Sequence, residues 1–135
     1  KLAANKYKDD SIIVYGRSFG TGIASWLAAS VSCRRLILEA PYFSIPSLFS
    51  SYAPIYPMEA MAKIKLPSGK YLQEVTFPVT IFHGDDDEVI PYRCAAKLKA
   101  VLKPADEFVT IHTGRHNNLS EFGIYKRKLD SLLKE

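Results

Sequence analysis

Three residues of this sequence could together perform nucleophilic chemistry: Ser18, Asp87 and His116. Ser18 is the centre of the motif GRSFG at residues 16–20, a G-x-S-x-G pattern that sets a serine on a sharp turn between a strand and a helix. A hydroxyl group needs a base to become a nucleophile near neutral pH, and that base needs an acid to orient it. The chain order serine, acid, histidine therefore points to acyl transfer through Ser18.

The turn around Ser18 also supplies groups that would stabilise developing negative charge. The helix after it presents its amino-terminal end to the site, and the backbone N–H of Phe19 is the expected oxyanion donor. The glycines at both ends of the motif allow strand and helix to approach each other closely. We expect Arg17, Tyr42 and Phe43 to contact the substrate.

The acid and the base each have rivals in the sequence. Asp86 is the main rival to Asp87 in the acidic run at residues 85–88. His83 at one strand end, and His112 in or at the end of another, fit structural histidines better than a base. His116 lies on a loop after the last expected strand, which is the setting that a base requires.

The acidic run at residues 85–88 could instead be a cation-binding loop. It lacks the alternating ligands and the distal glutamate of an EF-hand, and no set of His or Cys residues accompanies it. We therefore expect neither a metal nor a cofactor.

Alternating strand and helix patterns predict an α/β fold, a mostly parallel sheet with helices on both faces. Strands are expected near residues 11–15, 35–39, 78–83 and 107–112, and helices near residues 18–31, 91–103 and 119–134. Ligand sites gather at the carboxyl edge of such sheets. Ser18, Asp87 and His116 all follow expected strands, so they should meet at that edge.

Residues 41–71 differ from this alternation because they hold five of the eight prolines and six aromatic residues. Long regular elements are not expected there, although short helical turns over residues 47–52 and 59–64 are plausible. The segment is interpreted as an insertion above the sheet. Its aromatic residues fit either a core beneath the insertion or the lining of an acyl pocket.

Composition limits the class of protein. The chain has 135 residues, of which 47% are hydrophobic and 24% charged, as expected for one globular domain. Its net charge of +4 is not gathered in one basic stripe, so nucleic-acid binding is not indicated. Cys33 and Cys94 are interpreted as small buried hydrophobic residues. Without a long apolar run or a signal peptide, we expect a soluble, cytoplasmic protein.

Three motifs in order support a resemblance to a known family. They are residues 13–22 (IVYGRSFGTG), residues 82–84 (FHG) with Asp87 and residues 89–91 (VIP), and Gly114 with His116 and Asn117. Together they resemble the carboxyl-terminal half of α/β-hydrolases, most nearly the branch of Bem46-like and serine-aminopeptidase-like or monoacylglycerol-lipase-like proteins. The resemblance implies Ser18 as nucleophile, Asp87 as acid and His116 as base.

The resemblance also implies what the chain lacks and what it does. Residues 1–135 would be the carboxyl-terminal part of a single domain, with an insertion near residues 41–74. The first strands, and the loop that gives the second oxyanion donor, would be absent. Arg115 and Asn118 depart from the usual pattern around the histidine.

The expected function is hydrolysis of an ester, thioester or amide through an acyl-enzyme, on a small-molecule or lipid-like substrate. A non-catalytic binding or scaffolding protein is the alternative. A dehalogenase-like activity is disfavoured, because such an enzyme needs a carboxylate nucleophile at the strand-to-helix turn where this chain has Ser18. The exposed sheet edge would favour homo-oligomers.

Overall fold

A parallel sheet forms the centre of the computed structural model, which describes residues 11–55 and 63–134. In that part of the chain the strands are β1 (Ile13–Arg17), β2 (Arg35–Glu39), β3 (Val79–Gly84) and β4 (Glu107–Ile111). They pair in the order β1-β2-β3-β4, and every pair is parallel. The parallel sheet expected from the sequence is confirmed.

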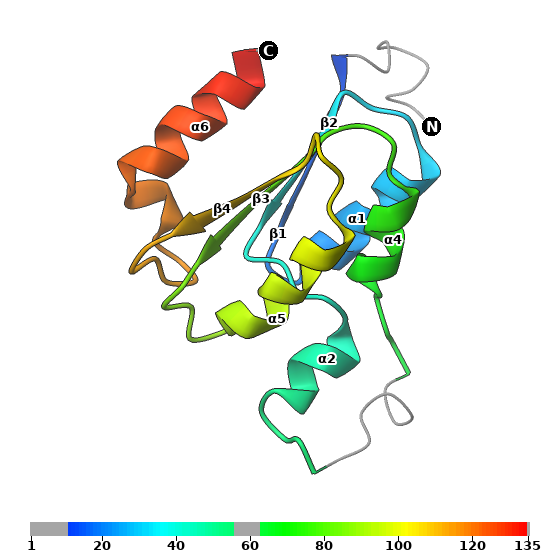
Figure 1. Cartoon of the computed structure of the whole chain (residues 1–135), viewed down its shortest axis with the longest axis vertical. Helices are drawn as coiled ribbons and strands as arrows, with labels where there is room; N and C mark the ends of the chain where they lie inside the picture. Colours follow the sequence, from blue (N-terminus) through cyan, green and yellow to red (C-terminus); the bar gives the residue numbers. More distant parts are fainter. Residues whose placement is uncertain (1–10, 56–62, 135) are drawn as a thin grey trace.

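Helices cover both faces of this sheet, as predicted (Figure 1). One face carries α1 (Gly20–Ser30), α4 (Ser68–Glu74) and α5 (Tyr92–Ala96), and the other carries α6 (Gly123–Lys134). No helix among the described residues is long and apolar enough to span a membrane.

The core divides into two clusters because successive strand residues point to opposite faces. The first cluster joins Leu36, Leu38, Val79 and Ile81 to Ala24 and Ala28 of α1 and Leu72 of α4. The second joins Ile37, Phe82, Val109 and Ile111 to Tyr125 and Leu132 of α6. Burial on both faces explains the nearly continuous apolar runs of the strands.

Several boundaries differ from those expected. β1 extends to Arg17 rather than ending at residue 15, because Gly16 and Arg17 still pair with Leu38 and Glu39. The helix expected over residues 91–103 is α5 followed by a 3-10 turn, Lys97–Val101. The last helix is interrupted at Phe122, which is extended between a 3-10 turn and α6.

The proline-rich segment contains more helix than the sequence indicated. Within it lie α2 (Ile45–Ser50), where a turn was expected, and α4, where none was. Pro67 is the amino-terminal cap residue of α4, and buried Leu72 packs this helix into the layer of α1. Residues 68–74 are therefore part of the helical layer rather than of an insertion above the sheet. Of the turn expected over residues 59–64, residues 59–62 lie outside the described part.

Candidate active site

Ser18 occupies a strained turn between β1 and α1. Its backbone φ of 52° lies in the left-handed region, which non-glycine residues seldom adopt. Two contacts hold the turn: the Ser18 N–H donates to the Glu39 carbonyl at 2.8 Å, and the Ser18 carbonyl accepts from the Thr21 N–H at 3.0 Å. Strain held in this way is common at functional sites, where the surrounding structure fixes it.

The two motif glycines have different roles. A Cβ atom at Gly16 would lie 2.5 Å from Cβ of Ala24, so only glycine permits this approach of α1 to β1. A Cβ atom at Gly20 would have no neighbour within 4 Å. The close approach expected at both glycines therefore occurs only at Gly16.

The structure brings Ser18, His116 and Asp87 together in one chain of hydrogen bonds. The Ser18 Oγ atom lies 2.8 Å from His116 Nε2, and His116 Nδ1 lies 2.9 Å from Asp87 Oδ2. The His116 and Asp87 residues are only 6% and 7% exposed, whereas Ser18 is half-buried. With the Nδ1–H donating to the carboxylate, Nε2 is free to accept the serine proton.

The loop after β3 turns Asp87 inward and its acidic neighbours outward. Asp87 Oδ1 accepts the N–H groups of Val89 at 2.9 Å and Ile90 at 2.7 Å, which fixes the carboxylate. Asp86 is exposed and lies 3.6 Å from the Arg115 guanidinium. The structure thus places Asp87, not Asp86, beside His116.

The acid loop and the histidine loop pack backbone against backbone. A Cβ atom at Gly84 would lie 2.0 Å from the Gly114 carbonyl oxygen, a distance that no side chain tolerates. The same carbonyl accepts the Asp86 N–H at 3.1 Å. This contact sets the separation between Asp87 and His116.

The other two histidines lie outside the hydrogen-bonded chain. His83 is buried, its Nε2–H donates to the Ile90 carbonyl at 2.9 Å, and burial lowers its pKa. Its Nδ1 atom has no hydrogen-bond partner within the described ranges, so this histidine is only half satisfied. His112 is exposed and pairs with Asp85 at 2.6 Å, and this hydrogen bond lowers the pKa of Asp85.

The residues expected around the substrate have varied positions. Phe19 is 55% exposed, and its N–H donates no hydrogen bond to any described residue. Tyr42 has no exposed surface, so it cannot touch a substrate in this conformation; its hydroxyl instead donates to the Phe19 carbonyl at 3.0 Å. Phe43 packs against the first core cluster. Tyr42 therefore supports the turn that carries Ser18, whereas Phe43 belongs to the core packing.

Arg17 joins the serine turn to the histidine loop. Its Nε lies 3.1 Å from Glu39 Oε1, and its Nη2 donates to the His116 carbonyl at 3.3 Å and to Asn117 Oδ1 at 3.1 Å. These contacts spread one guanidinium over the end of β2 and the loop after β4. Arg17 is therefore engaged by the protein itself, whereas the sequence suggested a role in substrate contact.

Glu39 is a member of the site that the sequence analysis missed. This carboxylate is 4% exposed at the end of β2, where it accepts hydrogen bonds from the hydroxyls of Tyr15 and Tyr125. Burial raises the pKa of both tyrosines, to about 12 for Tyr125. The available signal was a glutamate closing an otherwise apolar strand, since a buried carboxylate requires partners.

Comparisons with known proteins find similar chains among the α/β-hydrolases. No family model matches the chain. The α/β-hydrolase domain-containing protein 17C of Xenopus tropicalis is 29% identical over 125 residues, which cover 92% of this chain and 39% of that protein. The lysophosphatidylserine lipase ABHD12 of Macaca fascicularis is 28% identical over 120 residues, 74% of this chain and 30% of that protein.

A solved structure shows the same fold. The esterase domain of a Rhodothermus marinus protein superposes with a TM-score of 0.72 at 11% identity, covering 96% of this chain and 63% of that domain. The chain spans about two fifths or less of the length of the two curated relatives described above. Sequence similarity and fold agree, and together they support an α/β-hydrolase superfamily member.

Proposed function

We propose that this protein is a serine hydrolase that cleaves an ester, thioester or amide through an acyl-enzyme. One observation carries the proposal: Ser18 Oγ, both ring nitrogens of His116 and the Asp87 carboxylate form a continuous chain with separations of 2.8 and 2.9 Å. Such a chain activates a hydroxyl near neutral pH, because the proton has an acceptor within reach.

The reaction begins with proton transfer from Ser18 Oγ to His116 Nε2 as the oxygen attacks the substrate's carbonyl carbon. The electron pair of the carbonyl moves to its oxygen, and the N–H of Phe19 stabilises that charge. When the tetrahedral intermediate collapses, the bond to the leaving group breaks and His116 returns the proton to that group. Water, activated by the same ring, then attacks the acyl-enzyme and releases the acid and the free serine.

A lipid-like acyl substrate is the favoured class. One relative is named a lysophosphatidylserine lipase, and apolar side chains such as Phe19 and Ile23 lie exposed on and beside the turn. These side chains offer an acyl chain an apolar surface next to the nucleophile.

A fluorophosphonate probe tests the proposal, because it reacts with activated serines without needing the natural substrate. We expect labelling of the chain that is lost in Ser18→Ala and His116→Ala. Ser30→Ala, which alters an exposed serine of α1, is the matched control and should label normally. Labelling that persists in Ser18→Ala, or no labelling of folded protein, would favour the non-catalytic binding protein instead.

A further inference from the structure

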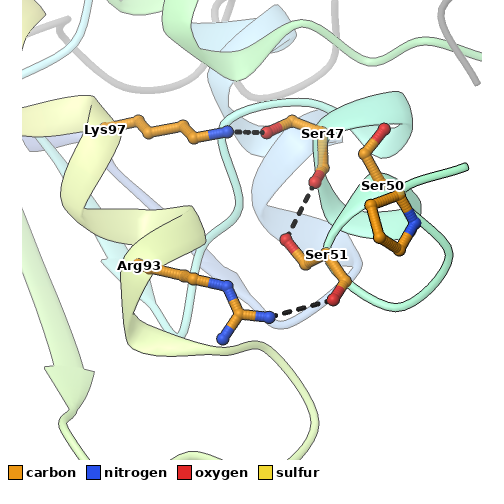
Figure 2. Close-up of a pocket in the computed structure, with 6 residues that line it drawn as sticks. Ser47, Ser50, Ser51, Arg93 and Lys97 are labelled. Carbon is orange, nitrogen blue, oxygen red and sulfur yellow. Dashed lines mark hydrogen bonds between the residues drawn. The ribbon is translucent and has the colours of Figure 1, made fainter.

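A cavity of about 330 Å³ lies between α2 and α5 (Figure 2), and Ser18, Asp87 and His116 are not among the residues that line it. It is lined by Ser47, Ser50, Ser51, Pro54, Arg93 and Lys97. Its size falls at the lower end of the range for small-molecule sites. More of its surface is apolar than polar, but five of its six lining residues carry a hydroxyl or a cationic group. A ligand would have to satisfy these polar groups.

The hydrogen bonds around this cavity hold two cations in place. Lys97 Nζ donates to Ser47 Oγ at 2.7 Å, and Arg93 Nη2 donates to the Ser51 carbonyl at 2.9 Å (Figure 2). Ser51 Oγ in turn donates to the Ser47 carbonyl at 3.1 Å. Both long side chains of α5 and its continuation are thereby fixed against α2, so binding a ligand would cost little further side-chain entropy.

Donors outnumber acceptors in the cavity. Ammonium and guanidinium groups carry several N–H donors and no acceptor, so Lys97 and Arg93 keep unused donors after these bonds. The Ser47 hydroxyl accepts from Lys97 and can still donate its own proton. A ligand that satisfies these groups must therefore bring several acceptor atoms.

Charge points to the same kind of ligand. Within residues 11–55 and 63–134, neither Arg93 nor Lys97 forms an ion pair with a carboxylate. Two cations beside one cavity repel each other, and an anion between them would remove that repulsion. A phosphate group fits both requirements, since it is negatively charged and has acceptor oxygens in several directions.

The cavity is also connected to the acid loop. The residue after Ser51, Tyr52, donates its hydroxyl to the Val89 carbonyl, with the Glu88 carbonyl 3.4 Å away, and Pro91 caps α5 directly after that loop. We propose that this cavity is a phosphate-binding site, with Lys97 and Arg93 as its principal ligands. The phosphate is either free or the headgroup of an ester substrate, and only the headgroup alternative rests on the proposed hydrolase function.

Inorganic phosphate tests the site independently of catalysis. Titration followed by nuclear magnetic resonance should show saturable binding, with the largest shifts at Arg93 and Lys97. Lys97→Met and Arg93→Met should each weaken binding about tenfold, as expected for loss of one charge-assisted hydrogen bond. Lys126→Met, on α6 across the sheet, is the matched control and should bind as the wild type does.

A conservative variant keeps the test decisive if a methionine variant fails to fold. Lys97→Arg retains the charge and should retain most of the affinity. Absence of saturable phosphate binding to the folded wild type would overturn the proposal. Equal weakening in Lys126→Met would overturn it as well, because the effect would then reflect net charge alone.

Two ester substrates distinguish the sources of the phosphate. If the headgroup binds here, Lys97→Met should raise the KM of a lysophospholipid about tenfold relative to that of a monoacylglycerol. If the KM ratio of Lys97→Met is unchanged while the wild type binds inorganic phosphate saturably, the site is assigned to free phosphate. If phosphate binds but neither ester is cleaved in a Ser18-dependent way, the hydrolase proposal fails while the cavity assignment stands.

Discussion

The contact between Gly22 and Tyr42 predicts a specific pair of compensating substitutions. A Cβ atom at Gly22 would lie 2.3 Å from the Tyr42 hydroxyl oxygen, far inside contact distance. That hydroxyl donates to the Phe19 carbonyl at 3.0 Å and so supports the turn that carries Ser18. Gly22→Ala must therefore displace either α1 or the tyrosine, and the serine turn with it.

The size of each effect follows from the surroundings. Overpacking costs about 1–3 kcal/mol and the better helix propensity of alanine returns about 1 kcal/mol, so Gly22→Ala should destabilise the fold by up to about 2 kcal/mol. Tyr42→Phe loses one hydrogen bond, worth about 1 kcal/mol. In the double variant the nearest neighbours of the new Cβ would be Leu66 Cβ at 3.0 Å and the ring carbon Cζ at 3.1 Å. These contacts need shifts of only a few tenths of an ångström.

The double variant should therefore be more stable than the sum of the single losses, by about 1 kcal/mol. Urea denaturation of the four proteins measures this coupling. The rate of fluorophosphonate labelling should fall about tenfold in Gly22→Ala and recover in part when Tyr42→Phe is added. Strictly additive losses of stability would refute the reasoning, because they would mean that the two groups do not meet.

Three further outcomes are expected. Arg17→Met should slow fluorophosphonate labelling about tenfold by releasing the His116 loop, and Arg17→Lys should not restore the rate, because one ammonium cannot span the same partners; full activity of the lysine variant would contradict this. Burial raises the pKa of Tyr125 from 10.0 to about 12, so the folded state keeps a proton that the unfolded chain loses. Stability should therefore fall as pH rises from about 10 to 12, and less steeply in Tyr125→Phe, which urea denaturation at several pH values would detect. Among the described residues β1 has a strand partner on one side only, and the ring of Trp26 is exposed, so the chain should associate. Light scattering should then find species above 15.1 kDa that Trp26→Glu reduces, and a monodisperse wild-type monomer would contradict the prediction.

Regular patterns made much of the fold predictable. The apolar residues 36–38, between Arg35 and Glu39, indicated a strand buried on both faces, and β2 has the expected bounds. Each strand also fixed the position of the loop after it. That is why the sequence predicts Ser18, Asp87 and His116 at one edge of the sheet.

Features that depend on long-range contacts were not predictable in the same way. Pro67 was interpreted as an interruption, but proline also starts helices, and only the packing of Leu72 shows that α4 begins there. Tyr42 was expected near the substrate because aromatic residues suit both cores and acyl pockets. Its burial depends on the space that Gly22 leaves on another element, and no local pattern reports that space.

The geometry of the candidate site depends as much on its supports as on the three residues that would react. The Glu39 backbone carbonyl holds the Ser18 N–H, while its carboxylate holds Arg17, which reaches the His116 carbonyl. Glu39, at the end of β2, thus connects the serine turn and the histidine loop through separate atoms. Removing the carboxylate would leave the triad chemically complete but would release Arg17 and leave two tyrosine hydroxyls without their acceptor. Accurate placement of a catalytic group requires such supporting contacts. Glu39 makes several of them, to Ser18, Arg17 and two tyrosines.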